Sequence, residues 1–255
     1  MFEKFLNNKK KLQRANVIIQ DHDACGVGFV ASMTGKQKRE VVKNGIEALK
    51  AVWHRGAVDA DGKTGDGAGI HIEFSRAFFI EQIKVTGHEV RNDQEICLGM
   101  VFLPRTNYSA QERCRTLLEQ ELLNNDFYIF GWRQVPVNPK VLGQKANDTR
   151  PEIEQIIFAC EKKYDFQELE RKLFIIRKKI EIQAAKEQLN DFYISSLSSK
   201  SVIYKGMFLA ENIADFYPDL MDERFTSRFA IFHQRFSTNT FPSWELAQPF
   251  RCFPF

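Results

Sequence analysis

The stretch that decides the fold of this chain is Asp23-Ala24-Cys25-Gly26-Val27-Gly28-Phe29-Val30-Ala31. Here a cysteine stands directly ahead of an apolar run that contains two glycines, after the leader 1–24. This placement predicts that Cys25 is a nucleophile, and that it becomes the true N-terminus when the leader is cut away. A buried core cysteine on an edge strand is the alternative, because cysteine is among the residue types most often buried. The segment alone leaves both interpretations open.

An N-terminal cysteine would carry its own base. A thiol with a pKa near ~8.5 is mostly protonated at neutral pH, whereas a free α-amine titrates near ~7.7–8.0 and can accept the thiol proton directly or through water. Nucleophile and base then belong to one residue, as in other N-terminal nucleophile enzymes. Gly26 and Gly28 would let the backbone approach a substrate closely, since glycine has no side chain.

Four sequence blocks resemble the class II glutamine amidotransferase region of the glutamate synthase large-subunit family. In chain order they are HDACGVG (22–28), HRGA (54–57), GDGAGI (65–70) and FHQRFSTNTFPSW (232–244). Shorter stretches between them also resemble that region: WRQVPVN (132–138), ERKL (170–173) and YKGM (204–207). Four ordered blocks make this a specific signal that runs through nearly the whole chain.

The resemblance implies an α/β fold, the N-terminal nucleophile sandwich of four αββα layers, incomplete at its C-terminus. It divides the chain into the leader 1–24 and a partial amidotransferase domain, 25–255, with a charged helical insertion at 150–190. In the family a His-Asn-Gly-Glu motif, which supplies the oxyanion hole, and a later Asp follow. Here the sequence reads Cys-Phe-Pro-Phe at 252–255 and ends. We therefore expect a truncated amidotransferase portion.

The resemblance also implies a role for each site residue. Cys25 would attack the side-chain amide of L-glutamine, form a thioester and release ammonia. Arg235 would hold the substrate α-carboxylate, a task suited to a planar guanidinium. Phe236 would form a wall of the pocket, and Thr238 would help to position glutamine. Arg55 would lie beside the nucleophile, although a surface salt bridge is an equally simple interpretation of this residue.

Three classes of function remain open at this stage. The first is the glutaminase part of glutamate synthase, which would deliver ammonia for reductive transfer to 2-oxoglutarate elsewhere in the enzyme. The second is another N-terminal nucleophile amidohydrolase, which would not need Arg235 for an amino-acid carboxylate. The third is a non-catalytic remnant. A Cys–His dyad with His54 or His233 is not required, because an N-terminal amine could act as the base.

Composition limits the cofactors, partners and compartment. The chain has 36 Lys and Arg against 33 Asp and Glu, a balance that argues against nucleic-acid binding. Its five cysteines form no close pair and no Cys-x-x-Cys motif, so we expect no metal and no cofactor in this chain. FMN, an iron–sulfur cluster, further synthase domains and a small reductase subunit are implied only for the full-length family protein. No run of about 18 apolar residues suggests a membrane span, and we expect a cytoplasmic protein.

Hydrophobic periodicity predicts alternating strands and helices. The block at 65–69 lacks the spacing of a phosphate-binding loop and is expected to be a turn near the site. Strands are expected at 27–32, 70–74, 96–103, 201–209 and 228–236. Helices are expected at 41–53 and over most of 152–190, and a third helix is expected to begin at a capping box, 109–112, and to end near residue 124.

Overall fold

The computed structural model of the chain describes residues 25–91, 93–160, 162, 164–237 and 240–250. The predicted leader 1–24 and Thr238 lie outside these residues. Within them the strands are β1 (Gly26–Ala31), β2 (Thr64–Glu73), β3 (Glu95–Leu103), β4 (Phe127–Gln134), β5 (Glu152–Cys160), β6 (Tyr193–Ser198), β7 (Ser201–Phe208) and β8 (Phe229–Gln234). The α-helices are α2 (Arg39–Ala51), α3 (Arg76–Val85), α4 (Tyr108–Leu123), α5 (Gln144–Asp148), α6 (Phe166–Lys186) and α7 (Ile213–Phe216).

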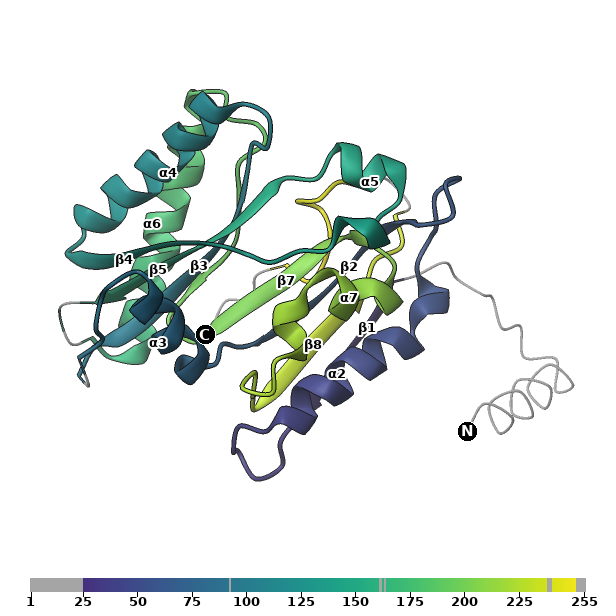
Figure 1. The fold of residues 1–255 in the computed structure, drawn as a ribbon, viewed down its shortest axis with the longest axis horizontal. Coiled ribbons are helices and arrows are strands. Elements are labelled where there is room, and N and C mark those ends of the chain that lie inside the picture. The colour runs from purple at the N-terminus through teal and green to yellow at the C-terminus, as the bar shows by residue number, and fades with distance from the viewer. Residues whose placement is uncertain (1–24, 92, 161, 163, 238–239, 251–255) are drawn as a thin grey trace, which may run out of the picture.

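The described strands form two antiparallel sheets. One has the order β1-β8-β2-β7 and the other the order β4-β5-β3-β6. In Figure 1, α4 and α6 lie on one side of the strands and α2 lies on the other. Side chains from both sheets, such as Ile70 and Met100, belong to one core cluster. This helix–sheet–sheet–helix arrangement confirms the predicted α/β fold class.

Helix α2 covers the sheet that contains β1, as the apolar periodicity predicts. Its buried face includes Val42, Ile46 and Leu49. Gly45 lies where the helix meets the sheet, and a Cβ atom on it would be only 2.6 Å from Ala230 Cβ. A larger residue would push α2 away from β8, so this glycine sets the distance between helix and sheet.

Helices α4 and α6 cover the other sheet. The predicted apolar face of α6 is confirmed, because Leu169, Leu173, Ile176 and Ile180 are all buried. The start of α4 differs from the prediction. The helix begins at Tyr108, and the side chain of Asn107, rather than of Ser109, accepts a hydrogen bond from the Ala110 N–H at 3.0 Å. An Asn at this position is as good a cap as Ser, and the competing capping-box pattern concealed it.

The prediction of a helix over most of 152–190 is wrong for its first part. Residues Glu152–Cys160 form β5, a strand that pairs with both β3 and β4. Glu154 in this strand is buried, and its carboxylate accepts a hydrogen bond from Arg115 Nε at 2.9 Å. Because this arginine satisfies the carboxylate, a glutamate can stand in a strand rich in buried apolar residues.

The block at 65–69 is also not a turn. It forms the first half of β2, where the pairing with β7 shifts register between Thr64 and Ala68. The strands β4 and β6 and the helices α3, α5 and α7 lie in segments for which the periodicity predicted no element. Strand pairing, rather than local pattern, determines the structure of the two strand segments, β4 and β6.

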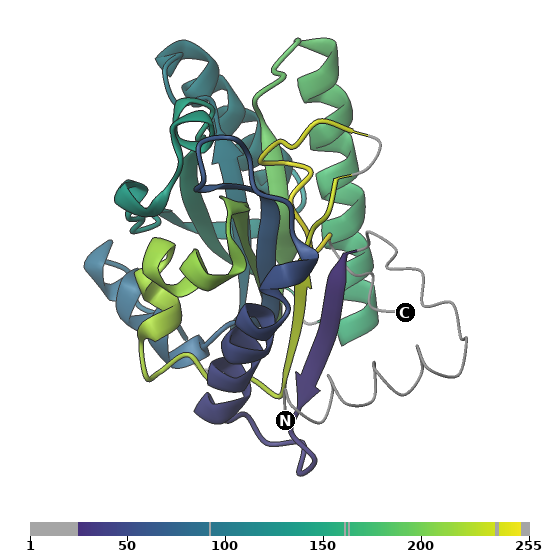
Figure 2. The same cartoon turned by 90° about the vertical axis from the view of Figure 1, so that its right-hand side faces the viewer.

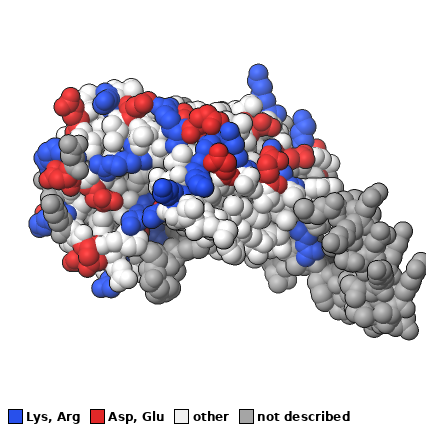
Figure 3. All heavy atoms as spheres, turned by 90° about the horizontal axis from the view of Figure 1, so that it is seen from below, with Lys and Arg blue, Asp and Glu red and all other residues white. Residues whose placement is uncertain are grey.

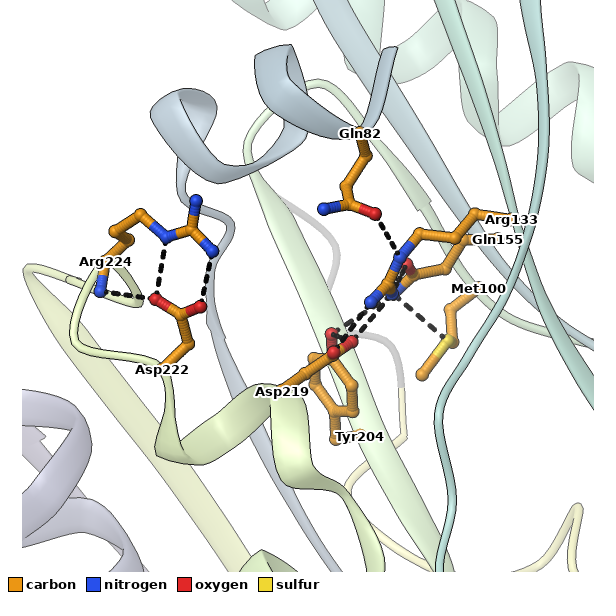
Figure 4. Close-up of polar contacts among 8 residues, drawn as sticks. All are labelled: Gln82, Met100, Arg133, Gln155, Tyr204, Asp219, Asp222 and Arg224. Carbon is orange, nitrogen blue, oxygen red and sulfur yellow. Dashed lines mark hydrogen bonds and ion pairs between the residues drawn. The ribbon is translucent and has the colours of Figure 1, made fainter. Parts of the chain in front are cut away.

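A buried polar network connects the two sheets (Figure 4). Arg133 of β4 donates from both terminal nitrogens to the carboxylate of Asp219, each at 2.7 Å. The Tyr204 hydroxyl of β7 donates to the same carboxylate at 3.1 Å and accepts from Gln155 Nε2 at 3.1 Å. Burial, and then the neighbouring Asp219 carboxylate, raises the pKa of Tyr204 well above its usual value. Each sheet thus contributes side chains to one hydrogen-bonded unit.

On the face shown in Figure 3, basic and acidic residues are intermixed. In the part of the chain that the structure describes, no helix combines the length and the apolar character needed to cross a membrane.

Asp219→Ala is expected to lower the free energy of unfolding by about 3–5 kcal/mol, because it leaves the buried Arg133 charge without its partner. Asp222→Ala is the matched control. Asp222 pairs with Arg224, whose side chain is 39% exposed, so its loss should change stability by about 0–1 kcal/mol. Urea unfolding of both variants measures the difference, and equal losses would contradict the structural role given to Arg133 and Asp219.

Candidate active site

The candidate active site begins where β1 pairs with β8. Gly26 lies opposite Gln234 in this antiparallel pair, so the residues just outside it, Cys25 and Arg235, come to the same end. Figure 2 shows β1 alongside β8 at the edge of the sheet. The backbone N–H of Phe236 donates to Cys25 Sγ at 3.4 Å, and Sγ lies 3.8 Å from the Phe236 carbonyl oxygen. Cys25 is exposed, so the interpretation as a buried core cysteine is wrong.

Arg235 is buried beside the cysteine, and three contacts fix its position. Its backbone N–H donates to the Gly67 carbonyl at 2.8 Å. Its guanidinium donates through Nη1 to the Asp66 carbonyl at 3.3 Å and through Nη2 to Thr240 Oγ1 at 2.6 Å. Two acceptors on different segments therefore orient the planar group, which favours its use as a fixed anion-binding side chain.

The predicted neighbour Arg55 lies in a short 3-10 helix, Trp53–Arg55, next to the start of β1. A Cβ atom on Gly26 would lie 3.0 Å from Arg55 Cβ, and Arg55 is half-buried. The turn can approach β8 because the following residue is a glycine: a Cβ atom on Gly56 would be 2.0 Å from Gln234 Nε2. The structure thus places Arg55 next to Gly26, the residue that follows Cys25.

His54 and His233, the two histidines considered as partners of Cys25, make no contact that would form a dyad with it. Both hydrogen-bond contacts of Cys25 Sγ in the described residues are with Phe236. His54 is exposed and lies edge-on to Trp53, with ring centroids 6.4 Å apart. Burial, and then the neighbouring Arg235 charge, lowers the pKa of His233. Neither residue is placed to remove the thiol proton.

Comparison with known proteins identifies the family. A model of the class-II glutamine amidotransferases matches residues 25–254. The chain belongs to this family.

Its curated relatives are much longer proteins. The chain is 61% identical over 231 residues to the glutamate synthase (NADPH) large chain of Azospirillum brasilense, covering 91% of this chain and 15% of that protein. The corresponding enzyme of Bacillus subtilis is 40% identical over 235 residues, covering 91% and 15%. The chloroplastic ferredoxin-dependent glutamate synthase of Spinacia oleracea is 38% identical over 235 residues, covering 92% and 14%. The chain therefore spans about 15% of the length of the curated relatives it matches.

The segment that follows β8 is held in place by side-chain hydrogen bonds. Lys205 of β7 is buried and donates from Nζ to the carbonyls of Glu245 and Ala247, both at 2.8 Å. Trp244 donates from Nε1 to the Ala146 carbonyl at 3.0 Å. These contacts hold the segment 240–250, and with it Thr240, against the sheet on which Arg235 lies.

Sequence reasoning missed the residues that support Arg235 from β2. Asp66 and Gly67 were considered only as part of a glycine-rich turn, although their block stood among the four that resemble the family. The block itself marked these residues as part of the family pattern. Their individual contacts depend on the pairing of β2 with β8, two strands that are distant from each other in the sequence.

The predicted site residue Phe236 is half-buried, and its backbone N–H, rather than its ring, contacts the cysteine.

A cavity of about 400 Å³ lies between α6 and the sheet of β2, β7 and β8. Phe174, Ile203 and Phe229 supply apolar walls, and His71 and Glu73 lie among its polar residues. Burial lowers the pKa of His71 to about 4. Cys25 and Arg235 do not line this cavity, and no group of three or more His, Cys, Asp or Glu in the described residues is placed to hold a metal ion.

Gly67→Ala is expected to lower the free energy of unfolding by about 2–6 kcal/mol, since strained backbone and overpacking each contribute about 1–3 kcal/mol. Gly67 has a φ of +131°, and a Cβ atom on it would lie 2.8 Å from Ala247 Cβ. Gly62→Ala is the control: its φ is +72° with nothing within 4 Å, so only the backbone term of about 1–2 kcal/mol applies. Urea unfolding that gave equal losses would show that Gly67 is not tightly packed.

Proposed function

We propose that this chain hydrolyses L-glutamine to glutamate and ammonia, with Cys25 as the nucleophile. One arrangement carries the proposal. The thiol of Cys25 is exposed, the backbone N–H of Phe236 donates to its sulfur, and Arg235, the residue before Phe236, is buried. Membership of the class-II glutamine amidotransferases supports the same chemistry.

In the proposed reaction, Cys25 Sγ attacks the carbonyl carbon of the glutamine side chain. A carbon–sulfur bond forms, the carbon–nitrogen bond breaks, and ammonia leaves with a proton from the general acid. Water then attacks the thioester, releases glutamate and returns the thiol.

The proposed base is the α-amine of Cys25, which exists only after the leader 1–24 has been removed. Once free, this amine belongs to the same residue as the thiol and can reach its proton directly or through one water. It would then return the proton to the departing ammonia. This assignment gives the histidines no part in the reaction.

Arg235 is proposed to bind the α-carboxylate of glutamine. Its guanidinium is fixed by the Asp66 carbonyl and by Thr240 Oγ1, so a carboxylate would meet a planar donor already in place. We assign to Phe236 and Thr238 the walls and polar contacts of the same pocket, and to Arg55 a supporting position near the thiol.

We further propose that the domain 25–255 supplies ammonia to a glutamate synthase reaction on 2-oxoglutarate. The names of the relatives support this wider role. FMN, an iron–sulfur cluster and a small reductase subunit would then belong to the rest of that protein. The relatives include both an NADPH-dependent and a ferredoxin-dependent enzyme.

Cys25→Ala should reduce glutamine hydrolysis by the processed protein to background, because no other described side chain is placed to form the thioester. Ammonia release and glutamate formation are the measurements, and the intact mass of each protein establishes that its chain begins at residue 25. Cys160→Ala, at a buried cysteine remote from the site, is the control and should keep the activity. Equal hydrolysis by wild type and Cys25→Ala would contradict the proposal and favour a non-catalytic protein.

Arg235→Lys should raise the KM for glutamine about 10-fold to 100-fold, because a charged hydrogen bond contributes about 1.5–3 kcal/mol and lysine cannot bind a carboxylate at two points. Hydrolysis of a simple acyl amide without an α-carboxylate serves as the comparison. If wild type prefers such amides and the substitution leaves KM unchanged, the protein is instead a different amidohydrolase.

A further inference from the structure

Asp66 lies where β2 departs from regular pairing, between the register positions of Thr64 and Ala68. It is only 8% exposed, and its backbone N–H donates to the Ala57 carbonyl at 3.3 Å. The irregular pairing turns this part of β2 toward the segment that leaves β8. A carboxylate buried at such a position needs a hydrogen-bond partner, and the Ser237 N–H of that segment is one.

Three consecutive backbone N–H groups after β8 each have an acceptor. The Arg235 N–H donates to the Gly67 carbonyl at 2.8 Å, the Phe236 N–H donates to Cys25 Sγ, and the Ser237 N–H donates to the Asp66 carboxylate. Asp66 and Gly67 therefore hold the residues on both sides of the N–H that faces the nucleophile. The backbone carbonyl of Asp66 also accepts a hydrogen bond, from Arg235 Nη1 at 3.3 Å.

We propose that Asp66 is a positioning residue, which fixes the turn 235–237 so that the Phe236 N–H and the Arg235 guanidinium meet the nucleophile and its substrate together. This inference rests on the proposed glutamine hydrolysis. A sulfur atom is a weak hydrogen-bond acceptor and cannot by itself hold the Phe236 N–H in place. The part-buried, charge-assisted bond from Ser237 to Asp66 is stronger and supplies that constraint.

Two substitutions separate the hydrogen bond from the charge. Asp66→Ala removes both the charge and the acceptor, whereas Asp66→Asn removes the charge and keeps an oxygen that can accept from Ser237. A role in positioning therefore predicts that Asn rescues function and Ala does not. A role through charge alone predicts that the two variants behave alike.

The test uses a diazoketone analogue of glutamine, which labels a nucleophilic cysteine, with the Cys25 peptide followed by mass spectrometry. We expect Asp66→Ala to slow labelling and to lower kcat for glutamine by about 10-fold to 100-fold, the size of effect that a misplacement of about 1 Å can have. Asp66→Asn should stay within about threefold of wild type in both measurements. Thermal unfolding establishes that each variant is folded at the assay temperature.

Ser237→Pro provides an independent variant, because it removes the N–H donor and leaves Asp66 unchanged. It should reproduce the loss caused by Asp66→Ala, and the double variant should lose little more than either alone. Equal labelling rates for Asp66→Ala and Asp66→Asn would overturn the inference, as would normal labelling of Ser237→Pro. Wild type that is labelled at Cys25 but does not hydrolyse glutamine would contradict the proposed function, and the labelling comparison would still decide the role of Asp66.

Discussion

The active-site geometry depends on the antiparallel pairing of β1 with β8. These strands are far apart in the sequence, and Cys25 and Phe236 are separated by 211 positions. A slip of one residue would turn every β8 side chain to the opposite face and would move the Phe236 N–H away from the thiol. The register is fixed in part by Gly28, since a Cβ atom there would lie 2.5 Å from Phe232 Cζ. Phe232 can occupy the core only because Gly28 leaves this space.

The β1–β8 pair is itself held by the packing of the two sheets. Helix α2 covers β1 and β8, and the Arg133–Asp219–Tyr204 network connects β7 with β4 of the other sheet. A buried ion pair contributes little net stability by comparison with apolar packing, but it is expensive to break and accepts few alternative geometries. We interpret the network as a constraint on how the sheets lie against each other. The apolar cluster around it supplies most of the favourable free energy.

Much of the fold could be predicted where local pattern and tertiary structure agree. The faces of α2 and α6 follow the helical period, and the core strand β3 is a continuous apolar run. Prediction failed at β5, because the charge of Glu154 is matched by Arg115, a residue 39 positions away. No local pattern contains that information.

The same limit applies to the prediction of the site. Cys25 and Arg235 could be chosen from their sequence blocks, whereas Asp66 acquires its role only through pairing between distant strands.

The site is assembled at the ends of strands rather than on a long loop, and this has a consequence for its chemistry. Cys25 precedes β1, Arg235 follows β8, and Asp66 lies within β2, so one sheet fixes all three. On the outer side, Lys205 holds the segment that carries Thr240 through two backbone carbonyls. A substrate carboxylate would therefore enter a site whose donors are already ordered, and little binding energy would be lost in ordering them. The irregular pairing of β2 is essential to this arrangement, because a regular strand would not bring the Asp66 carboxylate to the Ser237 N–H.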